Sequence, residues 1–192
     1  RPWKGTEELK QEELKQIEGG VCAATGFTAS GVYCGIRKNK SKKDLALIVS
    51  KQRASCACVY TQNLVKGAPI AVTKQNVADG YASAIICNSG NANTCNANGV
   101  EIAEAMCSLV GEALKIPPTD VVVASTGVIG KPLEIEPIAG GIAPLVGALG
   151  DDSDGAARAI MTTDVKKKEI AVKFSLGGAT CRIGGIAKGS GM

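Results

Sequence analysis

The sequence contains no histidine among its 192 residues. This absence excludes the Ser-His-Asp and Cys-His arrangements of nucleophilic catalysis, and it removes the commonest metal ligand. A nucleophile that works with this chain therefore needs a base from elsewhere. Aromatic residues are also scarce, at 3% of the chain, so few side chains are available to stack on nucleic-acid bases.

The eight cysteines include no pair with the Cys-x-x-Cys spacing of a zinc site. No apolar run reaches the ~18 residues of a membrane-spanning helix, and the first residues lack the charged-then-apolar pattern of a secretory signal. We therefore expect no metal and no membrane partner, and reduced thiols in a cytoplasmic or organelle-matrix protein. Cys56 and Cys58, two apart in "SCACVY", would share one face of a strand as small apolar fillers.

Positive charge is modest, with a formal net charge of +4. Eight of the 22 lysine and arginine residues lie in two short clusters, "RKNKSKK" at 37–43 and "KKK" at 166–168. With so few aromatic residues between them, these clusters are more typical of solvated turns than of a nucleic-acid surface. We expect no nucleic-acid partner.

Small and β-branched residues dominate the rest of the chain, which is 45% apolar and contains 24 glycines. Hydrophobic patterns in this part predict an α/β fold, with helices that cover a mixed sheet. Strands are predicted at 44–50, 55–62, 69–73 and 120–125, a buried strand that runs into a Gly- and Asn-rich loop at 81–95, and a hairpin around Gly177-Gly178 at 168–188. Helices are predicted at 100–114, at 135–149 and after an acidic cap at 151–154.

The domain organisation follows from the change of character at Gly19. Residues 1–18 are charged and helix-prone, and would form an exposed helix or an irregular lead-in. Residues 19–192 show no internal repeat and no low-complexity linker, which favours a single α/β domain. The final stretch, "GGIAKGSGM", follows an apolar run, and we expect the chain to be one piece of a longer polypeptide.

One glycine-rich stretch, "DVVVASTGVIGKP" at 120–132, resembles a phosphate-binding loop. Its spacing does not fit, because two residues separate Gly127 and Gly130 where four are needed, and Pro132 occupies the Ser/Thr position. What remains is the Thr126-Gly127 pair directly after a buried strand. Such a pair can supply the donors of an oxyanion hole, or it can be a plain turn, and the sequence leaves both readings open.

Three further stretches are weak signals on their own. The asparagine-rich "NSGNANTCNANG" at 88–99 could line a site or simply shape a loop. "MTTD" at 161–164 and "AKGSG" at 187–191 carry small polar and charged groups without a recognised spacing.

Taken together, however, these stretches resemble one family. "EGGVCAATGFTASGVYCGIRK", "ICNSGNANTCNANG", "ASTGVIGKPL", "AIMTTD" and "GGIAKGSGM" are similar to motifs of the ornithine acetyltransferase family, in the same order and over nearly all of the chain from Gly19. Members are made as precursors that cut themselves before a threonine, which becomes the N-terminus of a β chain. The resemblance implies that this sequence is the α chain. It also implies the layered α/β sandwich of the self-cleaving ornithine acetyltransferase and aminopeptidase type, completed by strands of the β chain.

The activity implied by the resemblance is ping-pong acetyl transfer in arginine biosynthesis. The β-chain threonine takes the acetyl group of N2-acetylornithine, ornithine leaves, and glutamate accepts the group to give N-acetylglutamate. No cofactor is implied, although some members also use acetyl-CoA as a donor. An N-terminal threonine carries its own base, an α-amino group with an unperturbed pKa of ~7.7–8.0, so a chain without histidine suffices.

The resemblance also assigns site residues by position. Thr126 and Gly127 match the oxyanion-hole pair, and Lys188 matches a substrate-binding lysine whose charge suits an α-carboxylate. Thr162 and Thr163 match the substrate-contacting end of "MTTD", with the register between them left open. The implied assembly is an αβ heterodimer that pairs into an α2β2 heterotetramer, in the cytoplasm.

Two features depart from the family pattern. "VCAATGF" stands where the family more often has "VTAPKGF", and the charged first residues are unfamiliar. Both lie outside the implied catalytic set. Two other functions are consistent with the sequence: an aminopeptidase or amidase with an N-terminal nucleophile, and a non-catalytic small-ligand-binding domain.

Overall fold

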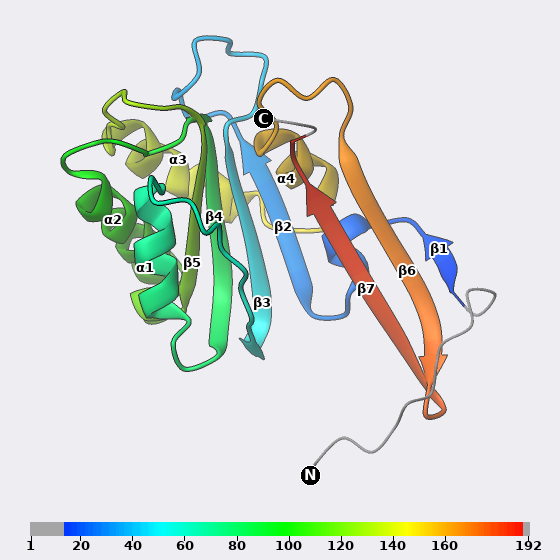
Figure 1. Ribbon diagram of the computed structural model, residues 1–192. Helices are drawn as coiled ribbons and strands as arrows, with labels where there is room; N and C mark the ends of the chain where they lie inside the picture. Colours follow the sequence, from blue (N-terminus) through cyan, green and yellow to red (C-terminus); the bar gives the residue numbers. More distant parts are fainter. Residues whose placement is uncertain (1–13, 190–192) are drawn as a thin grey trace.

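The computed structural model describes residues 14–189, and it confirms the α/β fold class with two sheets and four α-helices in this part of the chain (Figure 1). The four-stranded sheet contains β2 (Phe27–Val32), β3 (Leu45–Ser55), β4 (Tyr81–Asn91) and β5 (Val121–Val128) in that order. The three-stranded sheet has the order β1 (Lys15–Ile17), β6 (Lys168–Leu176) and β7 (Ala179–Ala187). The helices are α1 (Ala68–Asn76), α2 (Gly99–Leu114), α3 (Glu136–Gly147) and α4 (Ser153–Ala159), and two short 3-10 helices are η2 (Gly20–Ala23) and η3 (Pro118–Asp120).

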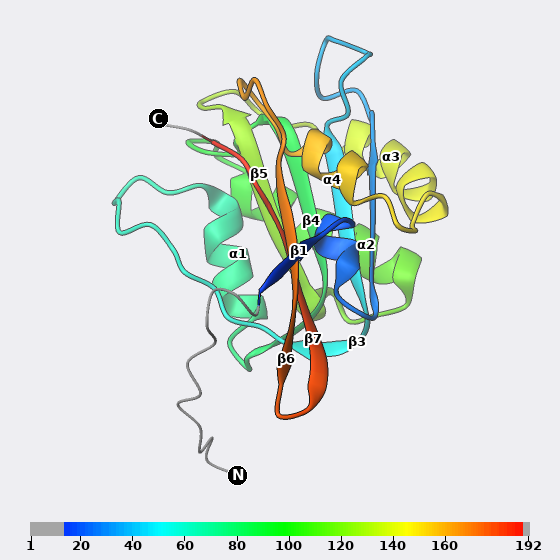
Figure 2. The same ribbon diagram turned by 90° about the vertical axis from the view of Figure 1, so that its right-hand side faces the viewer.

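The larger sheet is mixed, since β2, β3 and β4 pair antiparallel and β5 lies parallel to β4. Helices α1, α2 and α3 cover one face of it (Figure 1). Helix α4 and the smaller sheet lie on the opposite face, where β6 and β7 form a long hairpin (Figure 2). A hairpin around Gly177 and Gly178 is therefore confirmed, and both glycines have the positive φ that a tight turn needs.

Alternation along the strands sorts side chains between the two faces. Leu47, Ile86 and Val123 are register partners across three strands, and all three are buried beneath α1–α3. Their neighbours Ala46 and Cys87 face the other way, toward α4. The helix-side face therefore holds the large core residues, whereas the α4 side is lined by small ones.

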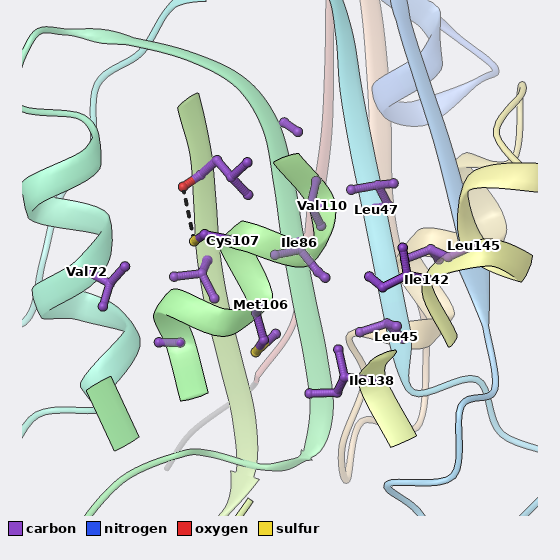
Figure 3. Packing of buried hydrophobic residues seen from close by; sticks show 14 of the residues in the cluster. Leu45, Leu47, Val72, Ile86, Met106, Cys107, Val110, Ile138, Ile142 and Leu145 are labelled. Carbon is purple, nitrogen blue, oxygen red and sulfur yellow. Dashed lines mark hydrogen bonds between the residues drawn. The ribbon is translucent and has the colours of Figure 1, made fainter. Parts of the chain in front are cut away.

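The main core lies between the larger sheet and α1–α3 (Figure 3). The helix predicted at 100–114 is confirmed as α2, in which Ala103, Met106 and Val110 are fully buried whereas Val100 is 45% exposed. The Cys107 thiol of the same helix lies 3.6 Å from the carbonyl oxygen of Val121 and is shown with a dashed line in Figure 3.

Helix α1 is a correction to the sequence analysis, which predicted a strand at 69–73. Pro69 in the first turn fits a helix start, and five apolar-rich residues are too few to distinguish helix from strand. The helix covers the free edge of β5. Its Thr73 hydroxyl donates to the carbonyl oxygen of Val123 (2.8 Å) and accepts from the Val123 N–H (3.1 Å). Thr73 thus takes the place of a neighbouring strand.

Three other expectations differ from the structure. Strand β3 ends at Ser55, so the strand predicted at 55–62 is wrong, although the Cys56 and Cys58 sulfurs still lie 3.9 Å apart. Lys15–Ile17 forms β1 against β6 rather than a helix, while the rest of the predicted lead-in, residues 1–13, lies outside the described residues. Strand β2 was not predicted. Its pattern is mostly of small residues, with little of the alternation that marks a strand.

Helix α4 packs unusually close to β2. The predicted acidic cap is confirmed, because the Asp152 carboxylate accepts from the Gly155 N–H at 2.8 Å. A Cβ atom built on Gly31 of β2 would lie 2.2 Å from the carbonyl oxygen of Gly155. The buried residues Ala156 and Ala159 continue this contact. Only hydrogen at position 31 permits the helix to lie this near the sheet.

We predict that Gly31→Ala lowers the free energy of unfolding by roughly 1–3 kcal/mol, because the added methyl group meets backbone that cannot move alone. Gly140→Ala is the control, since Gly140 lies on the exposed side of α3 with open space around its Cβ position. Gly140→Ala should leave stability unchanged or raise it by roughly 0.5–1 kcal/mol. Chemical denaturation of both variants of the purified protein measures the difference. Equal stabilities of the two variants would contradict the proposed close contact.

Candidate active site

Two of the residues singled out by the sequence meet directly, although 62 positions separate them. Thr126 lies near the end of β5, and Lys188 directly follows β7. The Lys188 Nζ donates a hydrogen bond of 2.9 Å to the Thr126 Oγ1. This contact joins the ends of strands from both sheets at one place.

Gly127 continues β5 and is not part of a plain turn. It pairs with Gly90 of β4, and its φ of 139° lies in the region that favours glycine. A Cβ atom here would lie 2.4 Å from the Gly90 carbonyl carbon and 2.5 Å from the Asn91 nitrogen. The backbone at 127 is therefore held against β4, and only glycine fits.

Asp164 ties the "MTTD" turn to the Thr126–Lys188 contact. Its carboxylate accepts from the backbone N–H of Gly189 (2.7 Å), from the N–H of Thr162 (3.2 Å) and from the Lys168 Nζ (2.5 Å). The hydrogen bond from Lys168, with those from the two backbone N–H groups, holds the pKa of Asp164 well below its usual range. Because Gly189 follows Lys188, the Asp164 carboxylate fixes the segment that carries the lysine.

Arg37 and Ser89 hold the same turn from the other side. The Ser89 hydroxyl donates to the carbonyl oxygen of Ala159 (2.5 Å) and accepts from the Arg37 Nε (3.1 Å). The Arg37 guanidinium also donates to the carbonyl oxygen of Met161. Arg37 itself is positioned by the fully buried Asp44, whose carboxylate accepts from the Arg37 backbone N–H at 2.9 Å.

The asparagine-rich loop serves as a structural scaffold, and its residues Ala92 and Thr94 also line a pocket beside α1. Asn93 is fully buried and donates to the carbonyl oxygen of Gly99 (2.8 Å) at the start of α2. Asn91 donates to the carbonyl oxygens of Lys131 (3.0 Å) and Pro132 (3.1 Å). These amides connect the end of β4 to α2 and to the segment after β5.

The cysteines are free thiols, and those nearest the core are poor nucleophiles. Burial raises the pKa of Cys87 to about 12, with the nearby Lys188 ammonium acting in the opposite direction. Burial also raises the pKa values of Cys34 and Cys107 to about 12. These thiols stay protonated at neutral pH, so they offer no thiolate for catalysis.

Within residues 14–189, no group of three or more histidine, cysteine, aspartate or glutamate side chains is arranged to bind a metal ion. In the same residues, no helix is both long enough and apolar enough to cross a membrane.

The structure brings some of the predicted site residues into contact and leaves others apart. Thr126 and Lys188 are in contact and Gly127 adjoins them. Thr162 is half-buried and bound to Asp164, whereas Thr163 is exposed. The sequence analysis did not select Arg37, Ser89 and Asp164. Each lies inside a stretch quoted for the family resemblance, but a lone charged or hydroxyl residue in such a stretch carries no spacing that marks its role.

The family model and the curated relatives that match this sequence belong to the same family. The sequence matches the ArgJ family over residues 28–192. It is 44% identical to the arginine biosynthesis bifunctional protein ArgJ of Symbiobacterium thermophilum and 46% identical to that of Caldanaerobacter subterraneus, in each case over 93% of this chain. The chain spans only 45% and 44% of the length of these two relatives.

Solved structures agree with this match. The crystal structure of ArgJ from Bacillus halodurans superimposes with a TM-score of 0.87 at 39% identity, and covers 93% of this chain and 95% of the other. Ornithine acetyltransferase from Mycobacterium tuberculosis, crystallised in complex with ornithine, gives a TM-score of 0.86 at 35% identity, over 93% of this chain and 96% of the other.

We predict that Asp164→Asn lowers the melting temperature of the protein at pH 7. The pKa of Asp164 is lowered in the folded state, so its stabilising effect is present above the ordinary aspartate value of ~3.9 and is lost as the pH falls through the folded value. The melting temperatures of variant and parent should therefore begin to converge below about pH 4 and meet only near the lower, folded pKa. Asp151→Asn is the control, because that exposed side chain makes no hydrogen bond among the described residues. Equal calorimetric melting temperatures of both variants at pH 7 would show that Asp164 does not anchor the turn.

Proposed function

Because this chain belongs to the ArgJ family, we propose that it is the α chain of an ornithine acetyltransferase of arginine biosynthesis. The complete enzyme moves the acetyl group of N2-acetylornithine to glutamate, and releases ornithine and N-acetylglutamate. It works in the cytoplasm without a bound cofactor. Contact between Thr126 and Lys188 is the observation that carries the proposal, because it joins two separate family motifs in one site.

The nucleophile in this proposal is the N-terminal threonine of a β chain cut from the same precursor. Its hydroxyl oxygen attacks the acetyl carbonyl carbon, while its own α-amino group accepts the hydroxyl proton. The C–N bond then breaks and ornithine leaves with that proton. Glutamate attacks the resulting acetyl ester through its amino group, and the threonine hydroxyl is restored.

Thr126 and Gly127 stabilise the negative oxygen that forms in each attack. The Lys188 ammonium can only donate, so in the observed hydrogen bond the Thr126 oxygen must accept. The hydroxyl proton of Thr126 is therefore left available for the oxyanion, together with the N–H of Gly127. Lys188 has further N–H groups for the α-carboxylate of the substrate, which passes beside Thr162 or Thr163.

Exposed apolar side chains support a partner chain. Ile170 of β6 and Ile183 of β7 are 56% and 59% exposed, and Ile85 of β4 is 39% exposed. Solvent-exposed isoleucine side chains on both sheets are typical of surfaces that another chain covers. We propose that the β chain covers them, completes the layered sandwich, and pairs with a second copy as an α2β2 heterotetramer.

The proposal is tested on the complete protein by mass spectrometry of every chain that co-purifies. We expect a second chain that begins with threonine and gains one acetyl group when N2-acetylornithine is added, with ornithine released. Glutamate should remove this acetyl group much faster than water does. Acetylation of no chain would contradict the proposal, and release by water at the same rate without glutamate would favour the amidase alternative.

We predict that Thr126→Ala lowers kcat by roughly 10²–10³ with little change in KM, because one oxyanion donor is lost and the Gly127 N–H remains. Thr126→Ser keeps the hydroxyl and is the control, with a much smaller loss. Both variants are assayed after mass spectrometry shows that the two chains are present. Turnover of Thr126→Ala within about threefold of the parent, far less than one such donor supplies, would remove Thr126 from the site.

A further inference from the structure

A second feature of the site region is a positively charged cavity of about 230 Å³, which we call the basic pocket. It forms where the loop after β2, the end of α4 and the "MTTD" turn come together. Its lining residues are Arg37, Ser41, Lys42, Lys43, Arg158, Met161, Thr162 and Asp164. Part of the "RKNKSKK" cluster therefore lines a cavity instead of forming only a solvated turn.

Most charges around the pocket are already paired. Lys43 lies 3.2 Å from the Asp152 carboxylate, and Arg158 lies 2.7 Å from Asp154. The lining carboxylate, Asp164, is neutralised by Lys168 at 2.5 Å. Each of these three ion pairs is close to neutral, so together they add little net charge to the pocket.

Arg37 and Lys42 are the exceptions. Neither side chain has a carboxylate partner among the hydrogen bonds and ion pairs of residues 14–189. The guanidinium of Arg37 donates only to neutral oxygens, those of Ser89 and Met161. A guanidinium has five N–H groups, so three remain for a ligand. The unpaired charge of the pocket is positive, and it suits a carboxylate.

The pocket adjoins the candidate active site. Thr162 is one of its walls, and the lining residue Asp164 accepts the N–H of Gly189. The preceding residue, Lys188, contacts Thr126. A substrate whose α-carboxylate lies near Lys188 can therefore extend a side chain toward Arg37 and Lys42.

We propose that Arg37 and Lys42 bind the side-chain carboxylate of the acetyl acceptor and so select glutamate for the second half-reaction. This inference rests on the proposed function. The two amino acids that use the site in turn share an α-carboxylate and differ in the side chain, which is an ammonium in ornithine and a carboxylate in glutamate. An ammonium group in the basic pocket would meet two unpaired cations, whereas a carboxylate would neutralise them.

The decisive variant is Lys42→Gln in the complete two-chain protein, because the exposed Lys42 side chain makes no contact that the fold needs. We expect the KM for glutamate to rise about fivefold, as for loss of a partly exposed charge pair. Arg37→Gln should raise it about 10- to 100-fold, as for a charge-assisted hydrogen bond. In both variants the effect on ornithine release should be at least about fivefold smaller. Lys40→Gln is the matched control, since Lys40 belongs to the same loop and does not line the pocket.

A direct binding measurement separates this inference from the proposed function. Calorimetry should show that Lys42→Gln weakens binding of N-acetylglutamate but not of N-acetylglutamine, which keeps the α-carboxylate but has an uncharged side-chain amide. This discrimination in a protein that forms no acetyl-enzyme would support the pocket and contradict the proposed reaction. The inference is wrong if Lys42→Gln binds both ligands as the parent does, or if it slows ornithine release as much as it impairs use of glutamate.

Discussion

The distance between α4 and β2 is the constraint on which the candidate site depends. Gly31 has no side chain, so the backbone of Gly155 can lie against the sheet, and the small buried residues of α4 keep that spacing along the helix. The chain leaves α4 directly over the end of β4, where the carbonyl oxygen of Ala159 accepts from Ser89. A larger residue at position 31 would lift α4 and the "MTTD" turn that follows it away from the strand ends.

From this turn, a chain of charged and polar contacts reaches both sheets. The carboxylate of the fully buried Asp44 accepts hydrogen bonds from backbone N–H groups and so positions Arg37. The Arg37 guanidinium in turn donates to the carbonyl oxygen of Met161. Asp164 holds Gly189 on the opposite side of the turn. Backbone groups are the acceptors or donors in all three contacts, so this network fixes the course of the chain. Thr126 and Lys188 are then placed by the ends of two strands.

Sequence patterns predicted the elements whose own residues decide their structure. Helix α2, the Asp152 cap of α4 and the Gly177-Gly178 turn carry local signals, and all three are confirmed. The strand prediction at 69–73 was wrong because this segment forms a helix, α1, that covers the edge of β5. Its contact through Thr73 depends on a strand 50 residues further along the chain. Within the site, family motifs selected Thr126 and Lys188. Arg37 and Asp164 could not be selected, because their contacts with the backbone of Met161 and Gly189 form only when folding brings distant segments together.

The absence of histidine shapes the chemistry that this arrangement can support. This chain has no imidazole to move a proton. In the proposed function it contributes donors that are held in place for a developing charge. The geometry of the Thr126–Lys188 pair suits that role better than a role in proton transfer. A lysine ammonium bound to a hydroxyl oxygen leaves the hydroxyl proton pointing away from the lysine, and it strengthens the hydroxyl as a donor. The oxyanion donors would then be ready before the substrate binds, and proton transfer would be left to the amino group of the partner chain.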